Sequence, residues 1–571
     1  MYLLDQGVSE ENIIAFTFTN KAAREMQHRL KQSLNRESNV SISTFHSFCF
    51  RDMRFYKDIL GYKDFPKVLT DEQRSGILKD ILKEFGLKKA NVQLFNNLSK
   101  IKNNVKFEIP EPEAILLNKV YNRYQEILIE TNSIDFDDMI PMYLKVLKSD
   151  NIYAKIMKEN AHYILVDECQ DTNQIQYDLI NELASVHKRI FMVGDDAQLI
   201  YSFRSSDRKL LENYKEICDD VIILNQNYRC AKNILELANN LIAKNSSLID
   251  KTLFSTIETV ARCKFHEFEN TYQEADMVSQ LILALVNKGY SYNDIAIIYR
   301  NNSQSYLIEK ELNAKKIPYE IYGNKNFIDY KEIMHLVSIY RVILNPKDLI
   351  SLKEVCINPI YGMEYYAYDS FIKSYDKSKP LFEEMINFNN PVINKFGNKL
   401  IELHDAFLLL SNEEFFNKIL ELFYYKDYIN STDDKIDKFE RIKILRSYVI
   451  ETDKSNLLEM FSMLSFDDKS KKDSNKVSLL TIHKSKGLEF KCVIIIGCNE
   501  GIIPPFNITN EAKAEERRLL YVGITRAREL LYLTSAQTYF INDIKKKYQP
   551  SSFLIETGLL GRAINNKFYY N

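Results

Sequence analysis

The stretch YILVDECQDTNQIQ (residues 163–176) places four apolar residues directly before two adjacent carboxylates, Asp167 and Glu168. A short, continuously apolar run is typical of a parallel strand that is covered on both faces of its sheet. Carboxylates are costly to bury, so two of them at the end of such a strand indicate a site for a cation or a polar ligand. The same sequence is compatible with two exposed acids in a loop, and for an isolated Asp-Glu pair that plainer interpretation is favoured.

Short runs rich in β-branched residues and bounded by polar turns recur along the chain. They are IIAFTFT (13–19), RIFMVGD (189–195), VIILNQ (221–226), DIAIIYR (294–300), VSLLTIH (477–483) and KCVIIIG (491–497). Helical patterns follow several of them, as in NKAAREMQHRL (20–30). This alternation predicts an α/β fold with parallel sheets.

Two blocks of the chain instead carry long helical periodicities with few strand signals. We therefore expect two α/β domains, each interrupted by a mostly helical insertion. The expected first domain comprises 1–54 and 150–218 with the insertion 55–149, and the second comprises 219–344 and 475–571 with the insertion 345–474. The 571 residues support several domains, because a single core stops growing beyond roughly 250–300 residues.

The composition excludes several classes of protein. With 76 basic and 78 acidic residues the net charge is −2, so any nucleic-acid surface must be a local groove. The eight cysteines form no CxxC pair and no zinc-like cluster with histidine, which favours reduced thiols in a cytoplasmic protein. The apolar runs are too short to span a bilayer, and no signal peptide is recognisable, so no membrane association is expected.

Other polar residues give the Asp-Glu pair a chemical context. RIFMVGDDAQLIYSFR (189–204) contains Gln198, whose amide can orient a water molecule or sense a γ-phosphate. LNQNYRC (224–230) offers Tyr228 for stacking on a base and Arg229 for phosphate charge. EERRLLYVGITRARE (515–529) offers Arg526, which we expect on a helix and suited to neutralising transition-state charge. Together these residues favour nucleotide hydrolysis.

The ordered set of motifs resembles that of the UvrD/Rep/PcrA family of superfamily-one DNA helicases. The segments that carry the resemblance are AFTFTNKAAREM (15–26), STFHSFC (43–49), IDFDDMI (134–140), VDECQDTNQIQ (166–176), VGDDAQLIYSFR (193–204), LNQNYRC (224–230), TIHKSKGLEFKCVII (481–495) and EERRLLYVGITRARE (515–529). One such motif alone would be weak, whereas eight in order make chance an unsatisfactory explanation.

The resemblance implies two RecA-like motor domains with ATP bound in the cleft between them. It also implies 3′-to-5′ movement along single-stranded DNA, with single-strand/double-strand junctions as further partners. The expected setting is DNA repair, replication or recombination. The sequence does not identify a loading partner.

The family also implies catalytic roles, residue by residue. Asp167 resembles the acid that is linked to Mg²⁺, and Glu168 resembles the general base. Gln198 matches the γ-phosphate sensor. Arg229 and Arg526 match the two arginines that the second motor domain supplies to ATP.

Further roles concern the nucleotide and the DNA. Tyr228 resembles the ring that packs on adenine, and Glu489 resembles the acid that contacts the ribose. Phe203 stands where the family usually has Trp, so its stacking area is smaller. Plainer alternatives stay open, because an aromatic residue in an apolar run can be core and a histidine can be structural. The expected DNA-binding residues are Phe18, Asn20, His46, Tyr201, Phe203, Arg204, His483 and Lys486.

One expected element is missing from the sequence. An ATPase of this kind needs G-x-x-x-x-G-K-[ST], whose backbone N–H groups cradle the phosphates, and no such string occurs. The family places that loop upstream of AFTFTNKAAREM, where only MYLLDQGVSEENII stands. We therefore expect a helicase fragment that is inactive without an upstream phosphate-binding segment. An ATP-dead single-stranded DNA-binding protein and a helicase subunit of a recombination nuclease are the alternatives.

Overall fold

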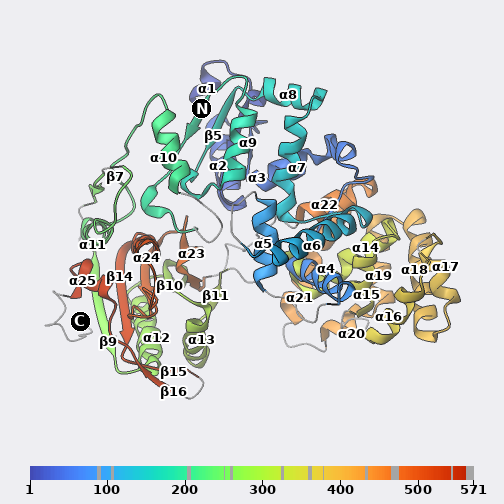
Figure 1. Cartoon of the computed structure of the whole chain (residues 1–571). Coiled ribbons are helices and arrows are strands. Elements are labelled where there is room, and N and C mark those ends of the chain that lie inside the picture. Colours follow the sequence, from blue (N-terminus) through green and yellow to red (C-terminus); the bar gives the residue numbers. More distant parts are fainter. Residues whose placement is uncertain are drawn as a thin grey trace. The chain divides into compact units, whose positions relative to one another are not determined.

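A computed structural model describes residues 1–86, 92–103, 109–201, 208–249, 251–257, 261–322, 327–357, 363–376, 378–430, 435–464, 475–541 and 544–560 (Figure 1). The chain forms two compact units. The first comprises Met1–Leu165, Ile175–Phe191 and Lys325–Lys469, and the second comprises Val166–Gln174, Met192–Asn324 and Ser470–Asn571. Two sheets, of four and six strands, confirm the expected α/β class.

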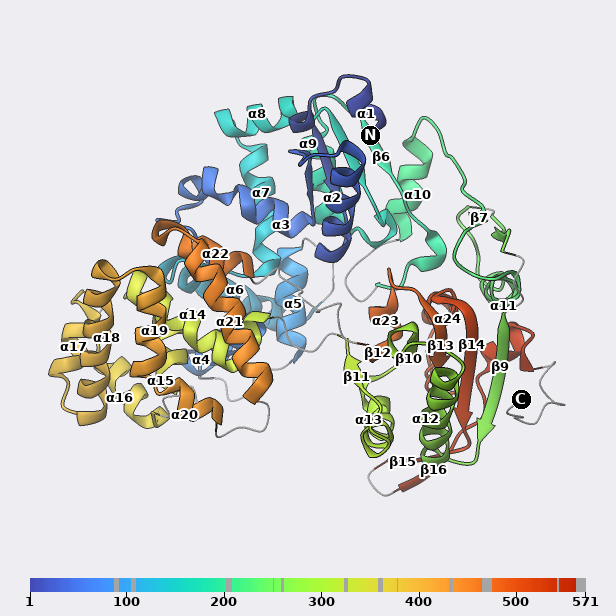
Figure 2. The ribbon, with the colours of Figure 1, turned by 180° about the vertical axis from the view of Figure 1, so that it is seen from behind.

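The six-stranded sheet is the centre of the second unit, and all its strand pairings are parallel. The strand order is β11-β12-β10-β13-β14-β9, as Figure 2 shows. The strands are β9 (Arg262–Phe268), β10 (Ile295–Tyr299), β11 (Tyr319–Ile321), β12 (Val477–Thr481), β13 (Phe490–Ile495) and β14 (Ala527–Ala536). The apolar runs at 294–300, 477–483 and 491–497 therefore form strands, as predicted.

Helices cover both faces of this sheet. Ile295 and Ile297 pack in one core with α12 (Thr271–Asn287) and α13 (Ser305–Ala314). Ala296 and Ile298 point to the other core, with α11 (Lys232–Ile242) and α24 (Asn510–Ile524). Because successive strand residues point to opposite faces, this double covering explains why the runs are apolar without alternation.

Shorter elements complete the second unit. They are α10 (Arg208–Ile217), α23 (Ile482–Ser485), α25 (Ser552–Glu556), the pair β7 (Gln226–Asn227) and β8 (Phe254–Ser255), and the antiparallel hairpin of β15 (Thr538–Ile541) and β16 (Ile544–Lys547). The predicted strand at 221–226 is wrong for residues 221–225, which lie outside any strand, and residues 221–224 are exposed. An apolar run becomes a strand only where a sheet edge pairs with its backbone groups, and among the described residues no strand pairs with residues 221–224.

The four-stranded sheet has the order β2-β1-β5-β6. Its strands are β1 (Ile13–Phe16), β2 (Ser41–Ser43), β5 (Tyr163–Val166) and β6 (Ile190–Met192). The accompanying helices are α1 (Tyr2–Asp5), α2 (Asn20–Leu34), α3 (Phe45–Asp52), α8 (Ile152–Asn160) and α9 (Gln174–Leu183). Thr19 begins α2 by accepting a hydrogen bond from the Ala22 N–H (3.1 Å). The strands at 163–166 and 477–481 thus belong to different sheets.

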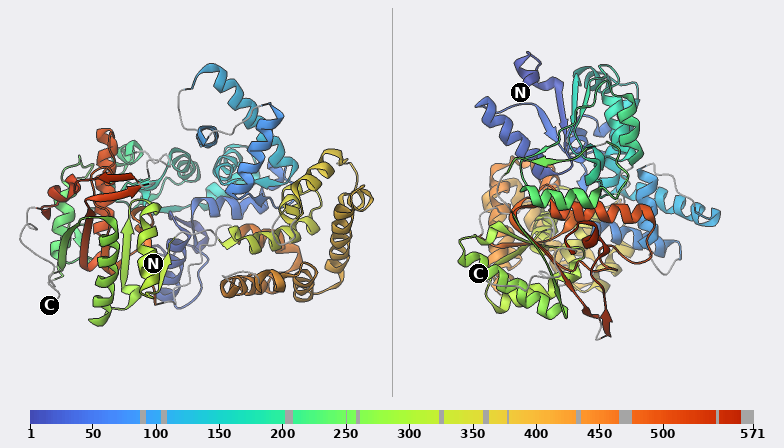
Figure 3. Two further views of the ribbon diagram at one scale, coloured as in Figure 1. Left: turned by 90° about the horizontal axis from the view of Figure 1, so that it is seen from below. Right: turned by 90° about the vertical axis from the view of Figure 1, so that its left-hand side faces the viewer.

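Both helical blocks belong to the first unit. The first contains β3 (Lys67–Val68), α4 (Asp71–Glu84), α5 (Val92–Lys102), α6 (Glu111–Glu130), β4 (Ser133–Ile134) and α7 (Phe136–Lys148). The second contains α14 (Lys331–Leu344), α15 (Leu349–Ile357), α16 (Tyr365–Ser374), α17 (Leu381–Asn387), α18 (Pro391–Leu409), α19 (Asn412–Leu422), α20 (Tyr425–Asn430), α21 (Lys435–Glu451) and α22 (Leu457–Met463), drawn yellow to orange in Figure 3.

The second block begins earlier than the sequence suggested. Its continuous apolar core includes Ile333, Leu336 and Tyr340 of α14, so this helix belongs with the helical block and not with the preceding sheet. We expected the boundary at 344, because the apolar periodicity of α14 does not reveal which core receives it. No helix among the described residues is long and apolar enough to cross a membrane.

A buried ion pair joins the two helical blocks. Lys67 Nζ lies 3.4 Å from Asp348 Oδ2 and donates a hydrogen bond to Ser351 Oγ (2.7 Å). Burial lowers the pKa of Lys67 to about 8, and the neighbouring Asp348 carboxylate opposes that shift. Lys67 thus fixes β3 of the first block to the beginning of α15 in the second.

A histidine in the second helical core makes stability depend on pH. Burial lowers the pKa of His335 to about 3, and its Nδ1 lies 2.5 Å from Tyr425 Oη. The pKa of a histidine in an unfolded chain is about 6.5, so below that pH the unfolded state binds a proton that the folded state does not bind. We expect the parent to lose about 1.4 kcal/mol more than His335→Gln between about pH 7.5 and 5.5.

Urea unfolding followed by circular dichroism at the two pH values measures this difference. His404→Gln is the matched control, because that side chain is 45% exposed in the same block. Parallel pH dependences of the parent and His335→Gln would contradict the prediction.

Candidate nucleotide site

The loops that follow β5 and β6 are held side by side by backbone hydrogen bonds. The Val193 N–H donates to the Val166 carbonyl (2.8 Å), and the Cys169 N–H donates to the Val193 carbonyl (2.9 Å). The pairing of the two strands therefore continues into the loops. It brings the segment containing Asp167 and Glu168 next to the segment that leads to Gln198.

Glu168 is fixed by a neighbour that the sequence analysis did not single out. Glu168 has a φ of +53°, in the left-handed region. The side chain of Gln170 donates from Nε2 to Glu168 Oε2 (2.5 Å) and accepts from the Asp195 N–H (2.9 Å). A Cβ at Gly194 would lie 2.6 Å from Gln170 Oε1, so only glycine leaves room for this bridge. The carboxylate of Glu168 is thus held in one place.

Lys486 lies inside the acidic cluster. Its Nζ pairs with Asp171 Oδ2 (2.5 Å) and Glu168 Oε2 (3.5 Å), and donates to the Gln198 carbonyl (3.0 Å). The Lys486 side chain is only 7% exposed. We expected Lys486 to contact DNA phosphate, whereas its ammonium is engaged with these carboxylates. A lysine in a motif does not reveal whether its charge points outward or into a cluster.

Asp167 is half-buried at the end of β5. Burial, followed by the negative charge of Glu168, raises the pKa of Asp167. A nearby cation would reverse this effect. Within the described part of the chain, no group of three or more His, Cys, Asp or Glu residues is arranged to hold a metal ion. Mg²⁺ is commonly held by one or two carboxylates together with substrate phosphates, so Asp167 suits that ion.

Arg526 is buried and hydrogen-bonded in several directions. It is 1% exposed and follows the end of α24 at Ile524, so it lies in a turn and not on the helix we expected. Its guanidinium donates to the carbonyls of Val522 (3.0 Å) and Leu488 (3.1 Å). Its Nη2 reaches Gln198 Oε1 (3.5 Å). Burial, and then the positive charge of Arg229, lowers the pKa of Arg526 to about 10.

Gln198 connects several of these groups. It ends a short 3-10 helix, Asp196–Gln198, beyond β6, and its Nε2 donates to Asp195 Oδ2 (2.8 Å). Lys251 Nζ pairs with Asp195 Oδ1 (2.6 Å) and Asp196 Oδ1 (2.5 Å). The sequence analysis missed Lys251, because nothing in the sequence links it to residues more than fifty positions away.

Arg229 and Glu489 form a second pair in the same unit. Arg229 Nε donates to Glu489 Oε2 (2.8 Å), and Arg528 lies 3.5 Å from the other carboxylate oxygen. The hydrogen bond from Arg229 holds the pKa of Glu489 below its usual range. Tyr228, beside this pair, is exposed and therefore accessible to a flat ring. Arg229 is thus adjacent in the chain to the exposed ring of Tyr228.

The expected DNA-binding residues lie in both units. In the first unit Asn20 Oδ1 accepts hydrogen bonds from Ser47 Oγ (3.1 Å) and Thr44 Oγ1 (3.4 Å). The half-buried ring of His46 lies 6.0 Å from that of Phe136. Phe18 is half-buried in the loop after β1, close to the beginning of α2. All three residues thus follow the carboxyl ends of β1 and β2.

The second unit contains the remaining DNA-binding candidates. Tyr201 Oη donates to the His483 carbonyl (3.1 Å), and Lys486 Nζ lies 5.4 Å from the centre of the Tyr201 ring. Tyr201 and His483 are therefore neighbours in the second unit. Phe203 and Arg204 lie outside the described residues.

Comparisons with known proteins match nearly the whole chain. Residues 1–219 match the UvrD/REP helicase N-terminal domain, and residues 222–538 match the UvrD-like helicase C-terminal domain. An ATP-dependent DNA helicase PcrA of Staphylococcus epidermidis (strain ATCC 35984) is 32% identical, over 97% of this chain and 81% of that protein. The protein of the same name from Staphylococcus aureus (strain Mu50) is 31% identical over the same shares.

The buried position of Lys486 leads to a stability prediction. In Lys486→Met the carboxylate of Asp171, whose side chain is 0% exposed, loses its cation. Breaking one half of a buried pair costs about 3–5 kcal/mol, so we expect a loss of that order. The double variant Lys486→Met/Asp171→Leu should recover most of it. Urea unfolding followed by circular dichroism measures both.

The matched control is Lys484→Met, because Lys484 is exposed two residues away. If Lys486→Met is as stable as this control and only its affinity for single-stranded DNA falls, Lys486 contacts phosphate and the prediction fails.

Proposed function

Because the chain belongs to the UvrD-like family of DNA helicases, we propose that it is an ATP-driven motor that moves 3′ to 5′ along single-stranded DNA. The observation that carries this proposal is the convergence of Glu168, Gln198 and Lys486 with the buried Arg526. These groups come from four distant segments of the sequence. Their convergence supports the proposal, because it holds the carboxylate of Glu168 and the positive charge of Arg526 in one cluster.

The arrangement suits phosphoryl transfer to water. Glu168, which is held by Gln170 and Lys486, would take a proton from the attacking water. Gln198 would orient that water, and Arg526 with Arg229 would neutralise charge that develops on the transferred group. Positioning and electrostatics do nearly all the work in such reactions. Mg²⁺, when bound, would shield the phosphate charge, and Asp167 is the residue suited to hold it.

The proposed DNA contacts rest on stacking and on phosphate charge. Tyr201 and His483, which are hydrogen-bonded to each other, are joined in this proposal by Phe203 and Arg204. Base–aromatic stacking tolerates any sequence, which a motor moving along DNA requires. The proposed substrates are single-stranded DNA and single-strand/double-strand junctions, in DNA repair, replication or recombination.

ATP turnover is the first test of this function. The chain contains no G-x-x-x-x-G-K-[ST] string, so we propose that on its own it hydrolyses ATP negligibly. A chain extended at its N-terminus by a segment with that loop should show DNA-stimulated turnover. In the extended chain, Glu168→Gln should abolish turnover and spare nucleotide binding. Phosphate release with and without single-stranded DNA measures the comparison.

The outcomes separate the proposal from its alternatives. Strong, Glu168-dependent turnover by the unextended chain would mean that another loop binds the phosphates. Inactivity of both chains would favour an ATP-dead DNA-binding protein. Strand cleavage by a purified complex would favour a subunit of a recombination nuclease.

DNA binding is the second test. Tyr201→Ala and Phe203→Ala should each weaken single-strand binding by about 1–3 kcal/mol, because each removes a stacking surface. Affinity should fall steeply with salt, since phosphate contacts release counterions. Fluorescence anisotropy of a labelled oligonucleotide across a salt series measures both effects. Tyr424→Ala, on an exposed ring of the second helical block, is the control; affinities equal to that control in both variants would refute the stacking assignment.

A further inference from the structure

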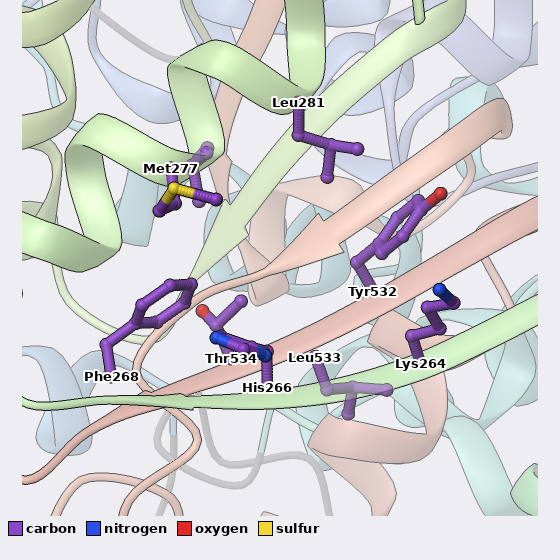
Figure 4. Close-up of a pocket in the computed structure, with 9 residues that line it drawn as sticks. Lys264, His266, Phe268, Met277, Leu281, Tyr532, Leu533 and Thr534 are labelled. Carbon is purple, nitrogen blue, oxygen red and sulfur yellow. The ribbon is translucent and has the colours of Figure 1, made fainter. Parts of the chain in front are cut away.

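A pocket in the second unit lies apart from the residues assigned above. It has a volume of about 530 Å³ and lies at the carboxyl ends of β10 and β13. The first turns of α12 and α13 and the hairpin β15–β16 complete its wall. In parallel sheets the carboxyl edge is the usual place for a ligand. A second pocket, between α12 and the strands β9 and β14, holds only about 10 Å³ and has room for little more than a water molecule (Figure 4).

Tyrosine rings surround the large pocket. Tyr306 is 72% exposed at its mouth, and Tyr272 is also exposed. Tyr539 and Tyr548 contact each other edge to face, with ring centres 5.0 Å apart. Four aromatic rings around one opening favour a flat, unsaturated ligand, because each can stack on it or meet its edge.

A carboxylate lies deeper in the same pocket. Glu274 is 4% exposed, and its Oε1 accepts hydrogen bonds from the Gly497 N–H (3.1 Å) and from Thr534 Oγ1 (2.5 Å). No described residue donates to Oε2, so this oxygen is available to a ligand that carries an N–H group. Burial also raises the pKa of Glu274.

The charge of the lining excludes one class of ligand group. Among the described residues that line the pocket there is no Lys, Arg or His, and Glu274 is the one acid. A phosphate placed here would find no positive charge and one negative neighbour. The lining therefore disfavours a phosphodiester and suits an uncharged ring.

We propose that this pocket receives a nucleobase of the bound single strand, and that Glu274 selects bases with an exocyclic amino group. The proposal rests on the proposed DNA-binding function and deepens it. A carboxylate accepts from the amino group of cytosine, whereas thymine and uracil present a carbonyl oxygen at the same position. The motor would then bind DNA of any sequence while holding one base with a preference.

Cytosine and uracil give a matched pair of ligands. They have the same size, and at C4 one carries an amino group and the other a carbonyl. We expect the parent to bind an oligodeoxycytidine of about 12 nucleotides roughly five- to tenfold more tightly than the matching oligodeoxyuridine. Fluorescence anisotropy at constant salt and pH measures the ratio of the two affinities.

Glu274→Gln should invert that preference. The Gly497 N–H and the Thr534 hydroxyl both require an acceptor, so the amide oxygen should take the place of Oε1. The amide NH₂ group would then face the pocket and donate to the carbonyl of uracil. The ratio should fall below one, while a merely structural role of Glu274 would weaken both oligonucleotides equally.

Tyr306→Ala is a second variant, on an exposed side chain whose loss leaves the fold intact. It should weaken binding of oligodeoxycytidine by at least about fivefold, because a stacking ring is lost. Tyr366→Ala, on an equally exposed ring of the second helical block, is its control and should change nothing.

The outcomes distinguish this inference from the proposed function. If the parent binds neither oligonucleotide, the DNA-binding function itself fails. If the parent binds both equally and neither Glu274→Gln nor Tyr306→Ala changes the affinities, the base pocket is refuted while DNA binding stands.

Discussion

Burial of the strands on both faces is the constraint on which the second unit depends. The central strands β10 and β13 present successive apolar side chains to two separate cores, so a charged group along β10 or between Cys492 and Ile495 would be costly. Chemistry is therefore confined to the two edges where strands begin and end. Glu489 and Arg526 directly precede β13 and β14, whereas the tyrosine pocket lies where β10 and β13 end. The sheet thus separates the edge that we propose to face nucleotide phosphates from the edge that we propose to bind a base.

The candidate nucleotide site also reflects the high free-energy cost of burying a charge. Lys486 and Arg526 are cations taken largely out of water, and each is compensated by carboxylate or carbonyl oxygens from other segments. These hydrogen bonds and ion pairs are directional, so the side chains of Lys486 and Arg526 keep their positions when no ligand is bound. A catalytic site arranged in advance spends little free energy on reorganisation during the reaction.

Most of the strands and the two adjacent acids could be predicted because their signals are local. Burial on two faces makes the run of β10 apolar without interruption, and Asp167 and Glu168 directly follow the apolar run of β5. The partners of these acids could not be found in this way. Lys486 meets Asp171 across 315 residues, and Lys251 meets Asp195 across 56, and no periodicity records either contact. The strand predicted from the apolar residues 221–224 did not form for a related reason, because strand formation depends on an edge supplied from elsewhere in the chain.

The ion pair of Lys67 with Asp348 and Ser351 has a consequence for dissecting this protein. The two helical blocks are separate insertions in the sequence, which invites their removal or exchange as independent modules. Each, however, contributes half of a charged contact that water does not reach. A chimera that replaces one block alone would therefore leave the other with an uncompensated charge in its interior. The two blocks are better exchanged together, from the same donor protein.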